Sequence, residues 1–233
     1  MKESAWGLGR RCVRGPLRHS GTASRVADDV NPLRLAVLGD SIGYGQGARV
    51  PADRLGPRLA AALTDEGFDV DLHVLAVPRS TSADLAAQVH RATPLGIEVA
   101  VVVVGANDLA RFVPPADAAR ALAEALAGLR ASGSDVVVVP APDMSVVPFV
   151  PAPFRSLVQG ACAVLQREQE AVARAAGAWF ADLDTQVGSA FAADPGLFSA
   201  DRFHPSSAGY ARIAEALAPH VIEAARARRD TAA

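Results

Sequence analysis

The sequence predicts an α/β fold, a flavodoxin-like three-layer α/β/α sandwich around a five-stranded parallel sheet. Short apolar runs alternate with longer segments of helical periodicity, and this alternation is typical of a parallel sheet covered by helices on both faces. The segment 97–104 contains Val99 and an unbroken valine run over 101–104, as expected of a strand buried on both faces. Right-handed crossovers then favour the strand order 2-1-3-4-5.

The first predicted strand covers residues 33–38, an apolar run that stops at Gly39. A helix is predicted over 57–66, because Pro57 suits a first helical position and Gly67 a C-terminal stop. Alternating apolar residues predict the second strand over 70–74. A helix follows over 82–91, with Ser82 as its candidate cap.

The same alternation continues after the third strand at 97–104. It predicts a helix over 116–131, a buried strand over 136–139, a helix over 154–176, a short strand over 178–183 and a last helix over 205–226. One apolar stripe marks the last helix as amphipathic; it consists of Tyr210, Ile213, Leu217 and Val221.

The length of 233 residues favours one domain, predicted over 32–227, between a basic and disordered tail at 1–31 and a short tail at 228–233. The N-terminal segment lacks the apolar core of a secretory signal, which favours a cytoplasmic location. No stretch approaches the roughly 18 apolar residues of a membrane span. The net charge of -2 gives no indication of a nucleic-acid partner, and a monomer is expected.

The two cysteines, Cys12 and Cys162, have neither the number nor the spacing of a disulfide framework or a zinc site. Cys162 is expected to be a small apolar core residue. Lys2 is the sole lysine among many arginines and alanines, a composition typical of a GC-rich, actinobacterial-like genome.

The first candidate site residue is Ser41, directly after the first predicted strand, in Gly39-Asp40-Ser41. A serine at the start of a loop that leads into a helix can present its hydroxyl outward, with its own backbone N–H facing a reacting carbonyl. Alone, the serine is equally well explained as part of an ordinary turn.

A second candidate is Asn107, which follows the valine strand in Gly105-Ala106-Asn107-Asp108. Its side-chain amide is a neutral donor that can hold an oxyanion. An Asn-Asp turn is the simpler explanation of this motif taken alone. Asp108 is expected to be structural.

Asp201 and His204 lie three residues apart in a predicted loop before the last helix. Serine is a weak nucleophile at neutral pH and needs an adjacent base, and histidine titrates in the right range. A carboxylate beside the histidine fixes its tautomer. Asp201 and His204 are therefore the expected acid and base that support Ser41.

Together these motifs closely resemble the SGNH (GDSL-type) serine hydrolase family, over residues 33 to about 221. The resemblance implies the SGNH hydrolase fold, no metal, no cofactor and hydrolysis of a small-molecule ester or thioester. It also implies a catalytic triad of Ser41, Asp201 and His204. Asp40, like Asp108, is expected to be structural and to hold its loop by hydrogen bonds. The oxyanion would be held by the backbone N–H of Ser41, the Asn107 amide and the residue at position 79.

Position 79 departs from the family pattern, because the family has a glycine after the second strand where this chain has Arg79. Any non-proline residue retains the backbone N–H, but glycine can be required for its backbone angles. We hypothesise that the Arg79 guanidinium overhangs the pocket and selects an anionic substrate. A side chain that points to solvent is the competing interpretation.

The expected reaction is hydrolysis of a small or medium-chain ester through an acyl-serine intermediate, with the apolar loop 144–154 as the wall for the acyl chain. An O-acyltransferase that uses the same residues is the alternative. A remote alternative is a dinucleotide-binding protein, since Gly43, Gly45 and Ala48 match a loose glycine pattern followed by Asp65 or Glu66. That match is weak, because Gly39 already occupies the end of the strand.

Overall fold

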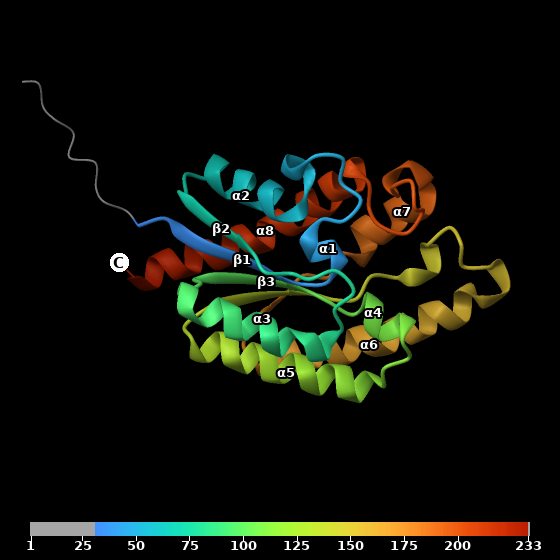
Figure 1. The fold of residues 1–233 in the computed structure, drawn as a ribbon, viewed down its shortest axis with the longest axis horizontal. Helices are drawn as coiled ribbons and strands as arrows, with labels where there is room; N and C mark the ends of the chain where they lie inside the picture. Colours follow the sequence, from blue (N-terminus) through green and yellow to red (C-terminus); the bar gives the residue numbers. More distant parts are fainter. Residues whose placement is uncertain (1–30, 233) are drawn as a thin grey trace, which may run out of the picture. The chain divides into compact units, whose positions relative to one another are not determined.

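The computed structural model describes residues 31–232 and places five parallel strands in one sheet with helices on both faces (Figure 1). The strand order is β2-β1-β3-β4-β5, which confirms the predicted fold and topology. The strands are β1 (Leu33–Gly39), β2 (Val70–Val74), β3 (Val99–Val103), β4 (Asp135–Val139) and β5 (Trp179–Phe180).

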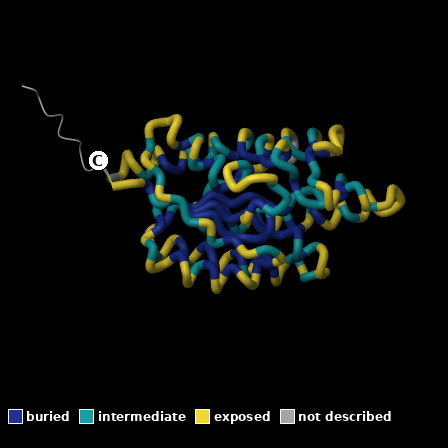
Figure 2. The backbone as a smooth tube through the Cα atoms, turned by 45° about the horizontal axis from the view of Figure 1, so that its top comes forward, coloured by how far each residue is buried: buried dark blue, intermediate teal, exposed yellow. Residues whose placement is uncertain are grey.

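Helices α2 (Leu55–Asp65) and α8 (Ser207–Ala232) pack together on one face of the sheet, whereas α3 (Leu85–Ala92), α5 (Pro115–Ala131) and α6 (Arg155–Ala175) cover the other. Because successive side chains of a strand point to opposite faces, each inner strand contributes to two cores. Leu35 and Val37 pack toward α2 and α8, while Ala36 and Leu38 pack toward α3 and α5. Figure 2 shows the strands as the most buried part of the chain.

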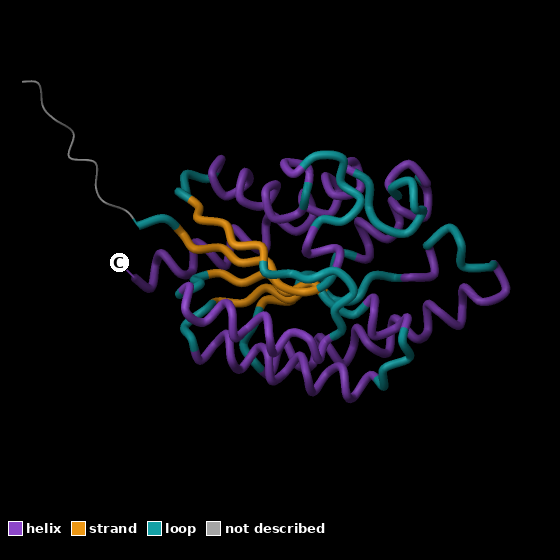
Figure 3. Tube along the Cα trace, in the orientation of Figure 1, coloured by secondary structure: helices purple, strands orange, loops and turns teal. Residues whose placement is uncertain are grey.

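Several short elements were not predicted from the sequence. They are the helices α1 (Ser41–Tyr44), α4 (Ala106–Ala110) and α7 (Ser189–Ala193), a π-helical turn over Asp184–Gly188, and single 3-10 turns over Pro51–Asp53, Ser82–Asp84, Thr93–Leu95, Met144–Val146, Ala152–Phe154 and Pro195–Leu197. Helices of one turn carry too little periodicity to be recognised in a sequence. Most of these turns lie in the long loops at the carboxyl edge of the sheet (Figure 3).

Several predicted boundaries and one predicted cap differ from the structure; α2, for example, begins at Leu55, two residues before the predicted start at Pro57. Strand β5 has two residues instead of the predicted span 178–183. Helix α8 continues to Ala232, so residues 228–232 are helical where a tail was predicted. Thr81 and Asp84 form the capping box before α3, and the predicted cap Ser82 instead donates its hydroxyl to Asp108.

The prediction of an N-terminal tail falls on residues outside those described, as does Cys12. Cys162 is buried in α6, as predicted. Among residues 31–232, no helix combines the length and the apolarity that crossing a bilayer requires.

Gly39 brings the end of β1 very close to β3. Its φ of +123° lies in the region that favours glycine, and a Cβ there would be 1.7 Å from the Val103 carbonyl oxygen. No other residue fits this position, so the glycine sets the point at which the chain leaves the sheet toward Ser41.

Candidate active site

Ser41 is the first residue of α1 and follows the end of β1 by two positions. The preceding Asp40 caps this short helix, accepting a hydrogen bond from the Ile42 N–H at 2.9 Å. The backbone N–H of Ser41 has no acceptor among residues 31–232, as is usual in the first turn of a helix. Ser41 is 6% exposed and lines a cavity at the carboxyl edge of the sheet.

Asp201 and His204 lie in a short loop whose two ends are joined by backbone contacts. A bridge pairs Phe198 with Pro205, and the Ser199 N–H donates to the His204 carbonyl at 2.7 Å. Asp201 Oδ2 lies 2.6 Å from His204 Nδ1. The predicted acid and base therefore meet through local geometry.

The carboxylate of Asp201 is also held by its other oxygen. Oδ1 accepts from the Ser199 hydroxyl at 2.7 Å and from the backbone N–H groups of Phe203 and His204, each at 2.9 Å. Partial burial raises the pKa of this carboxyl, but the hydrogen bonds from His204, Ser199 and Phe203 outweigh burial and hold the pKa well below its usual range. Asp201 is therefore ionised throughout the neutral range.

His204 connects this loop to the serine. Its Nε2 lies 3.1 Å from Ser41 Oγ, across 163 positions of sequence. With the ionised Asp201 beside Nδ1, the imidazole proton belongs on Nδ1 and Nε2 is left to accept from the hydroxyl. Phe203 packs edge-on against the His204 ring at 4.9 Å, and Phe149 stacks on Phe203 at 5.6 Å. The structure thus brings the three residues of the predicted triad into one hydrogen-bonded series.

Asn107 lies in α4, at the carboxyl end of β3. Its amide nitrogen donates to the Ser80 carbonyl at 3.0 Å, and a side-chain amide carries a second N–H. No hydrogen bond joins Asn107 to Ser41 within the described part of the chain. The structure leaves this second N–H available to a ligand.

Arg79 adopts the left-handed conformation for which glycine is favoured, with a φ of +72°. Arg111 holds this turn by donating from Nη2 to the Arg79 carbonyl at 2.8 Å. The Arg79 N–H has no acceptor among the described residues, so it remains a candidate oxyanion donor. Its side chain is exposed and does not line the cavity beside Ser41. The structure therefore gives no support to substrate selection by the Arg79 guanidinium.

Asp40 and Asp108 bind backbone N–H groups, in agreement with the structural role predicted for them. Burial raises the pKa of Asp40 to about 7; the hydrogen bond from Ile42 acts against this shift, and the charge of Asp108 adds to it. Asp108 accepts from the N–H and the hydroxyl of Ser82. Burial likewise raises the pKa of Asp108, against the effect of the hydrogen bonds from Ser82.

Two buried glutamines support the site and were missed in the sequence. Gln88 Oε1 accepts from the Gly39 N–H at 2.7 Å, and Gln88 Nε2 donates to the Gly39 carbonyl at 2.8 Å. Gln169 accepts from the Ala141 N–H and donates to the Val104 carbonyl. Each side-chain amide thus makes the backbone hydrogen bonds that a neighbouring strand would supply farther inside the sheet. A polar residue on a helix gives no sequence signal for this role.

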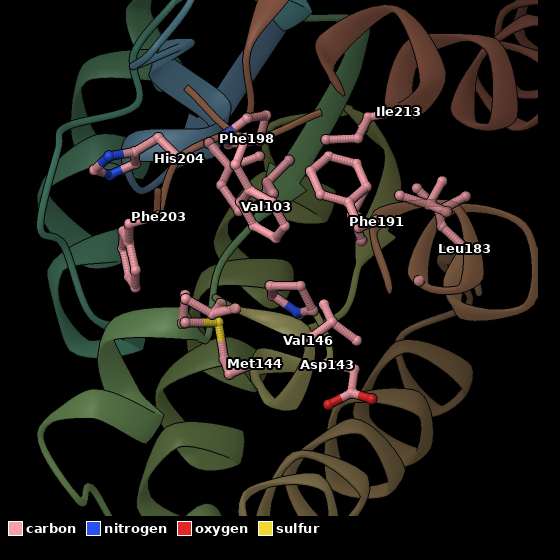
Figure 4. A pocket seen from close by; sticks show the side chains of 18 of the residues that line it. Val103, Asp143, Met144, Val146, Leu183, Phe191, Phe198, Phe203, His204 and Ile213 are labelled. Atoms are coloured by element: carbon pink, nitrogen blue, oxygen red, sulfur yellow. The ribbon is translucent and has the colours of Figure 1, made fainter. Parts of the chain in front are cut away.

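The cavity beside Ser41 has a volume of about 100 Å³ and an almost wholly apolar lining. Its walls come from strand ends, from α7 and from the loop after β4. Figure 4 shows the carboxylate of Asp143 directed away from the apolar side chains. The principal lining residues are Val103, Met144, Val146, Val147, Leu183, Phe191, Phe198, Phe203 and Ile213. Three of these, Met144, Val146 and Val147, belong to the loop predicted to form an acyl wall.

The glycine pattern considered for dinucleotide binding does not form a phosphate loop. Gly43 lies inside α1, and Gly45 ends that helix at a φ of +88°. A phosphate-binding turn needs its glycines between the strand and the start of the helix, where free N–H groups converge. The pattern is therefore accounted for by the end of α1.

Comparisons with known proteins place the chain in a family. The model of the GDSL-like Lipase/Acylhydrolase family matches residues 37–212. A curated GDSL-like esterase from Mycobacterium tuberculosis is 33% identical over 189 residues, 79% of this chain, and the chain spans 60% of that relative's length.

Two solved structures have the same fold. The crystal structure of TesA superposes with a TM-score of 0.66 at 24% identity, covering 82% of this chain and 99% of TesA. A catalytic mutant of Axe2, an acetylxylan esterase from Geobacillus stearothermophilus, gives a TM-score of 0.66 at 16% identity, covering 81% and 93% of the two chains. At these identities the similarity establishes the fold.

Proposed function

Because the chain belongs to the GDSL-like Lipase/Acylhydrolase family, we propose that it is a serine esterase that hydrolyses a small carboxylic ester or thioester through an acyl-serine intermediate. The observation that carries this proposal is the hydrogen-bonded series from Asp201 through His204 to Ser41. A nucleophile in contact with a base, and a base oriented by a carboxylate, are the parts that this chemistry requires.

The reaction begins when Ser41 Oγ attacks the acyl carbon and its proton passes to His204 Nε2. Asp201 stabilises the imidazolium through Nδ1. The tetrahedral intermediate collapses when His204 returns the proton to the leaving alcohol or thiol. Water then attacks the acyl-serine with His204 again as base, which releases the acid and restores Ser41.

Three donors are available for the oxyanion. The backbone N–H groups of Ser41 and Arg79 have no acceptor within the described part of the chain, and Asn107 has a second amide N–H. Unpaired donors at the carboxyl edge of a parallel sheet are suited to stabilise the charge that develops on the carbonyl oxygen. We assign these three groups to the oxyanion hole.

The size of the cavity favours a short acyl chain. A cavity of about 150 Å³ accommodates benzene, and the cavity here is smaller, at about 100 Å³. Its largely apolar lining suits a hydrocarbon tail. Acyl chains of a few carbons fit inside it, and a medium-length chain must extend beyond its mouth.

Hydrolysis of p-nitrophenyl esters, from acetate to decanoate, tests this function. We expect turnover by the wild type that is greatest for short chains and is lost in Ser41→Ala. Ser156→Ala, at an exposed position on α6, is the matched control and keeps full activity. Equal activity in Ser41→Ala and wild type would contradict the proposal.

The same assay separates hydrolysis from acyl transfer. With an added alcohol such as glycerol, an O-acyltransferase forms mainly the new ester, whereas a hydrolase releases mainly the free acid. We expect the free acid to predominate.

A further inference from the structure

A second cavity adjoins the catalytic one. It has a volume of about 360 Å³ and shares Val146, Phe191 and Phe198 with the cavity beside Ser41. Phe191 and Phe198 pack edge to face at 5.0 Å within this common wall, and Figure 4 labels both rings and Val146 among the side chains that line a pocket. The two cavities therefore lie side by side, separated by the side chains of this wall.

The second cavity differs from the first in its chemistry, because Arg155, Arg202 and Ser145 also line it. Arg155 uses Nε to donate to the Val150 carbonyl at 3.3 Å. No ion pair joins either arginine to a carboxylate in the part of the chain that the structure describes, and the Ser145 hydroxyl has no hydrogen bond there. Apart from Arg155 Nε, the guanidinium groups of these two exposed arginines and the Ser145 hydroxyl thus border the cavity without an acceptor in the described part of the chain.

The nearest carboxylates in the sequence serve other partners. Asp143 accepts from the Ser145 N–H, Asp194 accepts from the Gly196 N–H, and Asp201 is held by its own loop. None of the three lines the second cavity. Two positive charges around a space without a compensating carboxylate favour an anionic ligand, and guanidinium groups match carboxylate and phosphate oxygens in geometry.

Arg202 also connects this cavity to the chemistry. It lies between Asp201 and His204, and its φ of +58° is unusual for a residue with a side chain. Its backbone N–H donates to the Ser199 carbonyl at 2.9 Å, within the loop that holds the acid and the base. A ligand bound by Arg202 is consequently positioned by the same loop as His204.

We propose that the second cavity holds a carboxylate or phosphate group carried by the substrate, so that the enzyme prefers anionic esters. This inference rests on the esterase function proposed above and adds the charge of the substrate. It assigns to Arg155 and Arg202 the selectivity that the sequence suggested for Arg79, whose side chain lines neither cavity.

The test compares three esters of similar acyl length. They are neutral p-nitrophenyl butyrate, mono-p-nitrophenyl glutarate with its carboxylate on the acyl half, and butyryl glycerol phosphate with its phosphate on the alcohol half. We expect the wild type to have a higher kcat/KM for at least one of the two anionic esters than for p-nitrophenyl butyrate. Arg155→Gln should reduce that preference roughly tenfold, as expected for the loss of a charge-assisted hydrogen bond.

Arg167→Gln is the matched control, since Arg167 is an exposed arginine of the same helix and does not line the cavity. It should leave the preference unchanged. Arg202→Gln provides a second variant and should reduce the preference in the same direction as Arg155→Gln. A preference for anionic esters that survives both substitutions would overturn the inference, and so would a wild type that prefers the neutral ester.

Binding to the Ser41→Ala variant gives a readout that does not depend on turnover. Mono-p-nitrophenyl glutarate should bind roughly tenfold more tightly than p-nitrophenyl butyrate, and Arg155→Gln should abolish the difference. If the wild type hydrolyses no ester, the proposed function fails, while this binding difference still decides the inference. Binding of free glutarate or inorganic phosphate without any preference for the anionic ester would contradict it.

Discussion

The side-chain amide of Gln88 hydrogen-bonds to both polar groups of the Gly39 backbone, at 2.7 and 2.8 Å. Gln88 is 1% exposed, so these hydrogen bonds form out of contact with solvent. The amide holds the end of β1 two residues before Ser41 and also reaches the Ser80 hydroxyl. One helix residue thus supports both the strand end that leads to Ser41 and the loop that contains Ser80.

Gln88→Ala should lower the free energy of unfolding by about 2–4 kcal/mol, because a buried donor and a buried acceptor lose their partners together. Urea denaturation followed by circular dichroism measures the change. Gln159→Ala, at an exposed position on α6, serves as the control and should shift the midpoint little. Equal midpoints for the two variants would show that Gln88 does not support the strand end.

Asn107→Ala should reduce kcat by roughly 10²–10³ and change KM little, because an oxyanion donor acts mainly in the transition state. Asn107→Asp keeps the shape but presents a carboxylate to the developing charge, so its kcat should be no higher than that of Asn107→Ala. Unfolding midpoints close to that of the wild type would exclude a general loss of structure. An unchanged kcat in Asn107→Ala would remove Asn107 from the oxyanion hole.

The raised pKa of Asp40 predicts a specific pH dependence of stability. Between its ordinary value of 3.8 and the folded value of about 7, the folded chain retains a proton that the unfolded chain has lost. Stability therefore falls as pH rises through this window, by on the order of 4 kcal/mol from this group, and is level above it.

Asp40→Asn removes this contribution and leaves a side-chain oxygen to accept from Ile42. From pH 4 to 7 the variant should gain stability relative to the wild type, and above pH 8 the difference should be constant. Urea denaturation of both proteins across this range measures it. Parallel stability curves would mean that Asp40 titrates at an ordinary pKa.

Arg79→Gly should raise the free energy of unfolding by up to about 1 kcal/mol, since glycine adopts the left-handed conformation without the steric cost of a Cβ. The greater backbone entropy of glycine in the unfolded chain offsets part of this gain. Arg79→Ala keeps the Cβ and should gain nothing. Thermal unfolding compares the two variants. Because Arg79→Gly retains the backbone N–H, its kcat should stay within a few-fold of the wild-type value. A glycine variant no more stable than the alanine variant would show that the turn is unstrained.

The sequence was sufficient to predict the strand order and the positions of Ser41, Asp201 and His204. Strong strand and helix periodicity determines the order, and strand ends and a short loop position the three residues. The backbone conformation at position 79 could not be predicted, because it depends on Arg111 contacting the Arg79 carbonyl from a separate element.

The support from buried polar groups was also hidden in the sequence. Gln88 and Gln169 stand in helices with the ordinary pattern of polar residues, and their partners lie 49 and 65 positions away at strand ends. The second cavity was missed for a similar reason, since Arg155 and Arg202 come from elements that are distant in sequence. Only the tertiary arrangement identifies such residues.

The loop between Phe198 and Pro205 has a consequence for how the site responds to changes elsewhere in the chain. The hydrogen bonds that hold Asp201 against His204 arise between residues 199 and 204 of the described chain. A shift of this loop against the sheet would therefore leave the Asp201–His204 pair intact. It would change one distance, the 3.1 Å between His204 Nε2 and Ser41 Oγ, which joins residues 163 positions apart.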